Sequence, residues 1–331
     1  MFRSIIGIVL LAVSSQVLAA EKIRIGWVYA MANAPVVIAD KKGYFKEAGV
    51  DVEITSFTSG PILQQALAAG QLDMAYIGAP PVYHWYSRGL KSQILAKVNY
   101  GQAAIIARSD SNIKSLADLK GKKLAGVKKG SGNDVLLRGY ILGAEGKLDA
   151  DKDLQVIDMP SGNMGASLQA GVVDAAFVWE PFKTQELLRG NAKIVYDADD
   201  KLGKAVWYVV MALPETIEKK SDGLQRALSA HKKAVDFLNS SPTAGNDIIA
   251  DAFNISPIDG PAGKKYSPTD VVAAARKNLG WEWKLTDADQ AFIQQLMGYS
   301  LALGFIPGEM KTTQLVDTRY QAKLVKMEAG N

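Results

Sequence analysis

The sequence contains no cysteine and only two histidines, His84 and His231. Thiol nucleophiles, disulfide bonds and thiolate metal sites are therefore excluded, and we expect neither a metal nor another cofactor. No apolar run after the N-terminus reaches the roughly 18 residues that a membrane-spanning helix needs. The formal net charge of +4 is spread along the chain and forms no basic run, so nucleic acid is not an expected partner.

What is present is enough for two globular domains, because the chain has 331 residues, of which 48% are hydrophobic and 22% charged. Its first 20 residues differ from the rest. Arg3 precedes an apolar run over residues 5–13, and Val17-Leu18-Ala19 gives a small-residue end. These features predict a secretory signal peptide over residues 1–20 and an exported, soluble mature protein. No cysteine follows the cleavage site, so a lipid anchor has no attachment point.

One stretch, residues 59–81, reads as a loop, a helix, a turn, a strand and a second loop, with the sequence SGPILQQALAAGQLDMAYIGAPP. A similar stretch follows about a hundred residues later, over residues 160–181, as PSGNMGASLQAGVVDAAFVWEP. Ser59-Gly60 corresponds to Ser161-Gly162, and both copies continue with Ala-Gly-x-x-Asp before the strand. One interpretation is the ordinary reuse of strand-loop-helix units in α/β proteins. The other is two similar lobes whose loop edges face each other across a cleft.

The start of the mature chain predicts an α/β fold. The segment KIRIGWVYA from residue 22 alternates as a strand, a helix follows from Pro35, and residues 50–54 form the next strand. The alternation of strand and helix predicts a doubly wound sheet with ligands outside the carboxyl ends of its strands. Residues 103–108 and 205–213 are candidates for the two crossings between lobes, and the helical chain after Pro214 is expected to wrap the first lobe.

Three segments resemble the nitrate/sulfonate/taurine family of periplasmic solute-binding proteins: PVVIADKKGYFKEAGVDVE at 35–53, SLADLKGKKL at 115–124 and VWEP at 178–181. The resemblance implies two lobes, each a mostly parallel sheet flanked by helices, with two strand crossovers at a hinge. We expect lobe 1 to comprise residues 21–104 and 208–331, and lobe 2 residues 105–207. The resemblance also implies a periplasmic monomer that captures a small anionic or zwitterionic solute and delivers it to an ABC permease with its ATPase.

The glycine-rich turn Lys129-Gly130-Ser131-Gly132-Asn133 tests two phosphate-binding motifs and fits neither. It lacks the Gly-Lys-Ser/Thr of a Walker loop and the third glycine of the dinucleotide fingerprint. What remains is a capped helix N-terminus whose free N–H groups suit a sulfonate, carboxylate or nitrate, although an ordinary capped turn has the same sequence. Alkanesulfonate binders of the family often continue Gly-Ser-Ser-Ala-His here, and this chain departs from that pattern.

Trp179 and Glu180 should lie at the rim of the cleft. A buried carboxylate needs a cation or several donors, so Glu180 is expected either to meet a ligand ammonium or to brace a neighbouring loop. A cleft role for His84 is the minor alternative, because such a residue more often packs or caps locally. The predicted ligand-binding residues are Asn33, Ser59, Gly60, Gly78, Ala79, Ser131, Gly132, Asn133, Trp179 and Glu180.

The ligand itself is less defined by the sequence. Lys128, Lys129 and Arg138 flank the glycine-rich turn without filling it, so a singly charged ligand is favoured over phosphate. Taurine or another organosulfonate is the first expectation. Five aromatic residues could instead admit a heterocycle such as riboflavin or a thiamine-pyrimidine precursor: Trp27, Tyr29, Tyr83, Trp179 and Trp207.

Two other functions are alternatives to transport. The segment 35–53 also resembles fungal thiamine-pyrimidine synthases, but those enzymes carry a cysteine-rich motif that this chain cannot supply. No nucleophile with an adjacent base, and no carboxylate pair at catalytic spacing, stands out in the loops, so the chain is not expected to be an enzyme. A ligand-sensing partner of a membrane receptor would use the same cleft, and the sequence does not separate that role from transport.

Overall fold

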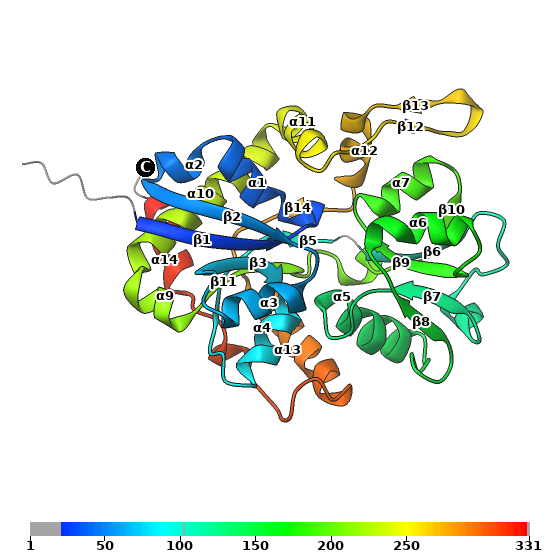
Figure 1. Cartoon of the computed structure of the whole chain (residues 1–331), viewed down its shortest axis with the longest axis horizontal. Coiled ribbons are helices and arrows are strands. Elements are labelled where there is room, and N and C mark those ends of the chain that lie inside the picture. Colours follow the sequence, from blue (N-terminus) through cyan, green and yellow to red (C-terminus); the bar gives the residue numbers. More distant parts are fainter. Residues whose placement is uncertain (1–20, 102, 330–331) are drawn as a thin grey trace, which may run out of the picture.

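Two five-stranded sheets form the frame of the protein, whose computed structural model describes residues 21–329 except residue 102 (Figure 1). The predicted signal peptide lies outside the described residues. The first sheet contains β1 (Glu21–Val28), β2 (Val50–Phe57), β3 (Met74–Gly78), β4 (Gln93–Lys97) and β11 (Tyr208–Ala212). The second contains β6 (Ala103–Arg108), β7 (Lys123–Gly126), β8 (Gln155–Asp158), β9 (Ala175–Trp179) and β10 (Ala192–Asp197).

The two sheets have the same strand arrangement. The first has the order β2-β1-β3-β11-β4 and the second, read from its opposite edge, β8-β7-β9-β6-β10. In each sheet the first three strands are parallel, the fourth runs against both of its neighbours, and the fifth returns to the common direction. Each sheet is therefore mostly parallel, which confirms the predicted fold class.

Helices cover both faces of each sheet, as the alternation of strand and helix requires. Figure 1 shows α1, α2 and α10 above the first sheet with α3 and α4 below it, and α6 and α7 above the second sheet with α5 and the π-helix η3 below it. Their bounds are α1 (Ala34–Lys41), α2 (Tyr44–Glu47), α3 (Gly60–Ala68), α4 (Ala79–Tyr86), α5 (Gly132–Val135), η3 (Leu136–Glu145), α6 (Ser161–Gln169), α7 (Phe182–Leu188), α8 (Asp199–Leu202), α9 (Pro214–Lys219) and α10 (Ser221–Ser240).

The repeat seen in the sequence has a structural basis. α3 and β3 in one sheet correspond to α6 and β9 in the other, since β3 and β9 each hold the third position of their sheet. The aspartate of the repeat has the same role in both copies. Asp73 accepts the backbone N–H of Arg24 at 2.8 Å, and Asp174 accepts that of Lys123 at 2.8 Å. Each carboxylate thus ties the turn after its helix to the neighbouring strand of the same sheet, β1 or β7.

The chain passes between the sheets twice. The first passage joins β4 to β6 through β5 (Asn99–Tyr100), and the second joins β10 to β11 through α8. Each passage leads directly into the antiparallel strand of the next sheet. This strand is β6 in the second sheet and β11 in the first. The lobe boundary expected at 207/208 falls at the start of β11, whereas the one expected at 104/105 falls inside β6, and both stay predictions.

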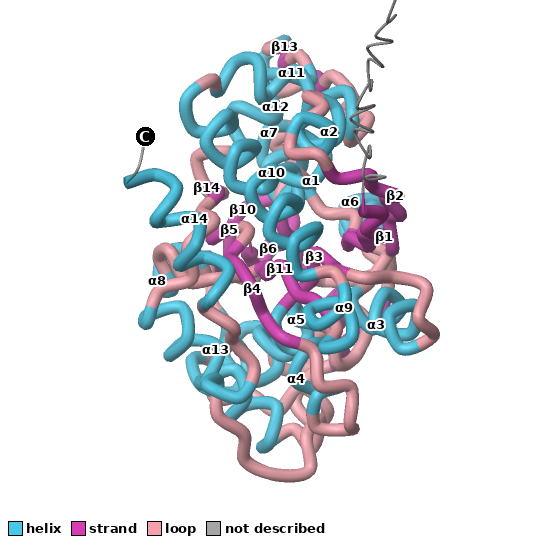
Figure 2. Tube along the Cα trace, turned by 90° about the vertical axis from the view of Figure 1, so that its left-hand side faces the viewer, coloured by secondary structure: helices cyan, strands magenta, loops and turns pink. Residues whose placement is uncertain are grey.

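The C-terminal part does not pack on the first sheet alone, which differs from our expectation. α12 (Pro268–Ala275) contacts α11 (Pro242–Ala252) and also α7, and α13 (Asp287–Ala302) contacts both α4 and η3. At the latter contact, a Cβ added to Gly139 would lie 2.5 Å from the Cβ of Tyr299. The tail therefore lies against helices that flank both sheets. Its last helix, α14 (Arg319–Ala329), contacts α10 and β4, and Figure 2 views the molecule from the side on which α14, α9 and α10 lie.

The remaining elements are short, and they are β12 (Ile258–Asp259), β13 (Lys265–Tyr266), β14 (Gly280–Trp281), η1 (Met31–Asn33), η2 (Leu116–Leu119), η4 (Pro261–Gly263) and η5 (Thr312–Gln314). The core runs through both sheets. On β1 the predicted alternation is correct, since Ile23 and Ile25 are fully buried while Lys22 is exposed. No helix in the described part of the chain is long and apolar enough to cross a membrane.

Candidate ligand-binding site

A cavity of about 470 Å³ lies at the carboxyl ends of the parallel strands of both sheets. From the first sheet it is lined by residues at the ends of β1, β2 and β3, and from the second by residues that follow β7 and β8 or end β9. Because ligands of doubly wound sheets bind at these edges, the position agrees with the sequence prediction. The lining residues are Val28, Tyr29, Ser56, Phe57, Thr58, Ser59, Gly60, Ile62, Gly78, Pro81, Val127, Lys128, Ser131, Gly132, Asn133, Asp158, Met159, Pro160, Ser161, Trp179, Trp207 and Tyr208.

The N-terminus of α3 points donors at this cavity. Ser59 is the N-cap residue in an extended conformation, but its side chain makes no capping bond. Its Oγ is buried and has no hydrogen-bond partner within the described part of the protein. Gly60 allows α3 to begin against α4, because a Cβ at this position would lie 2.8 Å from Cγ of Pro81. The first N–H groups of α3 and the Ser59 hydroxyl are therefore available to a ligand.

The glycine-rich turn supplies the facing wall and is held in place by its own bonds. Ser131 caps α5 by accepting the backbone N–H of Asp134 at 3.2 Å. Gly130, whose φ is +79°, donates its N–H to the Asp134 carboxylate at 2.8 Å, and Arg138 donates to the same carboxylate at 2.7 Å. Burial raises the pKa of Asp134, while Gly130 and Arg138 oppose that rise. The turn is thus both a capped helix start and part of the cavity wall.

The glycine-rich turn lies close to the end of β3. Gly78 ends β3, and a Cβ added there would lie 3.6 Å from Cα of Gly132. A Cβ added to Gly132 would in turn lie 3.5 Å from Cδ of Pro80. The end of β3 in the first sheet and the start of α5 beside the second sheet are therefore within van der Waals distance of each other, as a cavity shared by the two sheets requires.

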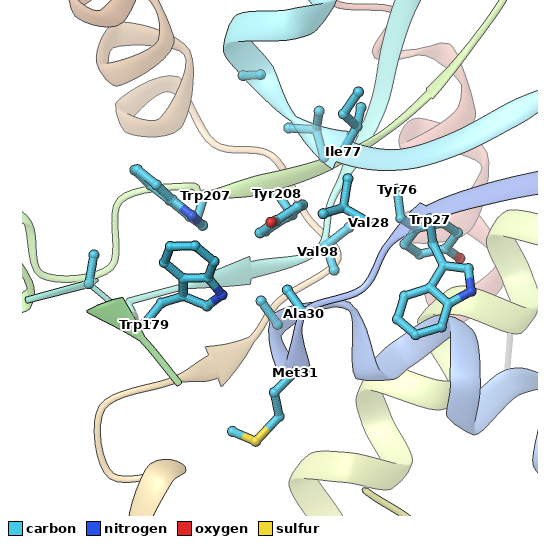
Figure 3. Packing of buried hydrophobic residues seen from close by; sticks show 14 of the residues in the cluster. Trp27, Val28, Ala30, Met31, Tyr76, Ile77, Val98, Trp179, Trp207 and Tyr208 are labelled. Atoms are coloured by element: carbon cyan, nitrogen blue, oxygen red, sulfur yellow. The ribbon is translucent and has the colours of Figure 1, made fainter. Parts of the chain in front are cut away.

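Aromatic side chains line another part of the cavity. Trp179 ends β9, Trp207 precedes β11 and Tyr208 begins it, and all three are at least nine-tenths buried. Figure 3 shows their rings grouped together, while Trp27 lies farther along the core. Trp27 and Tyr83, two of the aromatic residues suggested for the cleft, do not line the cavity; the Tyr83 hydroxyl is hydrogen-bonded to Ser300 at 2.9 Å.

Seven of the ten predicted ligand-binding residues line this cavity, whereas Asn33, Ala79 and Glu180 do not. The lining includes Ser59, Gly60, Gly78, Ser131, Gly132, Asn133 and Trp179. Asn33 is fully buried away from it and donates its Nδ2 to the carbonyl of Val28 at 2.7 Å. Ala79 is buried at the start of α4. His84, the weaker candidate, is also outside the lining and is hydrogen-bonded to Ser300 at 3.0 Å.

Glu180 follows Trp179 but lies in a buried polar cluster outside the cavity. Its carboxylate accepts the side-chain N–H of Asn278 at 3.0 Å and the backbone N–H of Thr184 at 3.2 Å, and Lys183 Nζ lies 3.7 Å away. Burial raises the pKa of Glu180, and Lys183 opposes the rise. These contacts correspond to the bracing role that was weighed for Glu180, because no part of its side chain is exposed to the cavity.

Two charged residues at the cavity were not predicted. Lys128, which we expected only to flank the turn, lines the cavity, and so does Asp158 at the end of β8. Both side chains are exposed. Phe57, Met159 and Tyr208 also belong to the lining, as does Tyr29, which the sequence suggested for an aromatic cleft. For Lys128, Asp158, Phe57 and Met159 the available signal was position, because each ends or follows a strand whose carboxyl end faces the cavity; Tyr208 instead begins β11.

Residues 18–253 match the NMT1-like family. The chain belongs to the NMT1-like family. Within the described residues, no group of three or more histidine, aspartate or glutamate side chains is placed to hold a metal ion.

Relatives of this NMT1-like chain are named as binding proteins. A Brucella abortus (strain 2308) protein named as a binding protein is 30% identical over 269 residues, which cover 78% of this chain and 82% of that relative. A Bacillus subtilis (strain 168) protein named as an aliphatic sulfonates-binding protein is 29% identical over 237 residues, which cover 70% of this chain and 69% of that relative.

The fold of the NMT1-like chain is that of periplasmic binding proteins. The crystal structure of the periplasmic aliphatic sulphonate binding protein SsuA from Escherichia coli superposes with a TM-score of 0.73 at 23% identity, covering 89% of this chain and 96% of that one. The family resemblance read from the three sequence segments is confirmed. The chain is a solute-binding protein and not an enzyme.

Proposed function

We propose that this chain is the periplasmic substrate-binding component of an ABC importer, and that its cavity captures a small organic ligand with one anionic head, such as taurine or another organosulfonate. The observation that carries the proposal is a cavity into which two helix starts, at Ser59-Gly60 and Ser131-Gly132, present backbone donors from the two sheets. Such donors stabilise an anion without a lysine contact.

The charges at the cavity favour one net negative charge or a zwitterion over a dianion. Lys128 and Asp158 are the charged side chains of the described lining, and they offset each other. A carboxylate at the wall disfavours a multiply charged anion by repulsion, while it suits a ligand that also carries an ammonium group. The names of the sulfonate-binding relatives support the same ligand class.

The direct test is a thermal-unfolding screen of refolded mature protein, since refolding removes ligand retained from the cell. The panel contains taurine, alkane- and arylsulfonates, nitrate, phosphate, riboflavin and a thiamine-pyrimidine precursor. A ligand at about 100 times its dissociation constant should stabilise the protein by about 2.7 kcal/mol. We expect sulfonates to raise the unfolding temperature and phosphate to leave it unchanged. A panel in which only the heterocycles stabilise the protein would refute the anionic ligand class.

Ser59→Ala is expected to weaken sulfonate binding by about 1 to 2 kcal/mol without lowering the free energy of unfolding. The reason is that Ser59 Oγ has no partner within the described protein, so folding loses no hydrogen bond. Calorimetric titration measures the first quantity and urea unfolding the second.

Ser267→Ala is the matched control, because Ser267 caps α12 outside the cavity and accepts the N–H of Asp270 at 3.1 Å. It should lower the free energy of unfolding by about 1 kcal/mol and leave ligand affinity unchanged. Equal affinities of wild type and Ser59→Ala would remove the Ser59 hydroxyl from the site.

A further inference from the structure

The aromatic side chains of the cavity wall restrict which chemical group the ligand carries besides its anionic head. This inference rests on the proposed function. Trp179 and Trp207 are each 8% exposed, and Tyr208 is 6% exposed. Trp179 belongs to the second sheet, whereas Trp207 and Tyr208 belong to the passage that enters the first sheet. Flat apolar surfaces from both halves of the frame thus reach one cavity.

The anionic head leaves most of this cavity unfilled. The loops that present donors to it are made of small residues, Ser59-Gly60 and Ser131-Gly132, and they form only part of the wall. A volume of about 470 Å³ falls in the range of roughly 300–1,000 Å³ that is usual for drug-sized ligands. A sulfonate with a two-carbon chain would leave the indole faces without a partner.

The indole N–H of Trp179 points to the same conclusion from a different observation. Nε1 is buried and has no hydrogen-bond partner in the described protein. A buried donor without an acceptor is destabilising, so native structures rarely keep one without a reason. Since Trp179 lines the cavity, a ligand is the natural source of the acceptor.

We propose that the ligand is an aromatic monoanion whose ring packs between Trp179 and Trp207 and one of whose acceptor atoms receives the Trp179 N–H. Aromatic rings prefer offset or edge-on contacts with other rings, and an indole offers both a face and a donor. A ring bound to Trp179 on one side and Trp207 on the other contacts the second sheet and the passage into the first sheet at once, which an alkyl chain of similar length does with less surface.

The test is a titration of the refolded mature protein with four sulfonates by calorimetry: methanesulfonate, taurine, benzenesulfonate and naphthalene-2-sulfonate. We expect naphthalene-2-sulfonate to bind at least tenfold more tightly than methanesulfonate, with benzenesulfonate between them. If taurine or methanesulfonate binds as tightly as the aryl compounds, the proposal that the ligand is aromatic is overturned, while the proposed function stands. If none of the four sulfonates binds, the proposed function fails as well, so the two failures are distinguishable.

Two variants assign the effect to the indoles. Trp207→Leu removes one ring face and should reduce the ratio of naphthalene-2-sulfonate to methanesulfonate affinity at least fivefold; this ratio is independent of how much of the variant is folded. Trp179→Phe keeps a ring but removes the N–H, and should weaken both aryl ligands about fivefold. Trp283→Phe is the control, because Trp283 lies outside the cavity under Lys232, and it should change neither value. An unchanged ratio in Trp207→Leu would contradict the proposal.

Discussion

Replacing Lys183 by methionine is expected to lower the free energy of unfolding by about 3 to 5 kcal/mol, because it removes the buried cation that faces three carboxylates, one of which is fully buried. Lys183 is fully buried, and its Nζ lies 3.1 Å from Asp199 and 3.3 Å from Asp197. The same ammonium is 3.7 Å from the fully buried Glu180. Burial alone would lower the pKa of Lys183, but the three carboxylates raise it, so the lysine is charged at neutral pH.

The cluster formed by Lys183 and its three carboxylate partners also connects the cavity to both passages of the chain. Asp199 accepts the N–H of Ala103 at 3.3 Å, and Ala103 begins the strand that follows the first passage. Asn278, which donates to Glu180, packs its carbonyl against Gly101 of that passage. Loss of Lys183 is therefore expected to loosen the segment next to Trp179 as well as to destabilise the fold.

Urea unfolding followed by circular dichroism measures the effect, and Lys219→Met is the matched control. Lys219 pairs with Glu215 at 2.8 Å on the surface, where both side chains are mostly exposed. Its replacement removes the same charge but should cost less than about 0.5 kcal/mol. The double variant Lys183→Met with Glu180→Gln should recover part of the loss, since one orphaned charge is gone. A loss no larger than that of the control would show that the cluster does not stabilise the fold.

The free energy of unfolding is expected to fall by about 3 kcal/mol between pH 6.5 and pH 4 on account of His231 alone. His231 is fully buried, and burial lowers its pKa from 6.5 to about 4. Between these two values the unfolded chain binds a proton that the folded chain does not. Stability from this residue is therefore complete above pH 6.5 and is lost as the pH falls toward 4.

The neutral form of His231 is the one that the structure accommodates. Its Nε2 is hydrogen-bonded to the carbonyl of Lys97 at 2.9 Å, while Nδ1 is buried without a partner in the described protein. A proton added at Nδ1 would be a buried charge without an acceptor.

Comparison of wild type with His231→Gln isolates this effect from the titration of the carboxylates. Glutamine can still donate to Lys97, and it does not titrate. We expect the stability of wild type, measured by urea unfolding at several pH values, to fall more steeply than that of the variant over this range. Burial likewise lowers the pKa of His84 to about 4, so His84→Gln should flatten the profile by a similar amount. Parallel profiles for wild type and His231→Gln would contradict the expectation.

The sequence by itself determined the class of fold and the parts of the site that depend on local backbone. Alternating strand and helix signals from residue 22 onward predicted the parallel strands. The Ala-Gly-x-x-Asp repeat indicated two equivalent units, in each of which the aspartate accepts a backbone N–H of the neighbouring strand. The helix starts after Ser59 and Ser131 were predictable as well, because start signals depend on residues only a few positions apart, although only Ser131 makes a side-chain capping bond.

Only the tertiary structure decided which side chains face the cavity. Trp179 and Glu180 are neighbours in the sequence, yet the indole lines the cavity and the carboxylate belongs to a buried cluster, because β9 ends at Trp179 and Glu180 lies in the turn that leads into α7. The partners that hold Glu180 include Asn278, 98 positions away, and no local pattern reveals such a contact. Lys128 and Asp158 likewise acquire their place at the cavity from the pairing of β7 with β8.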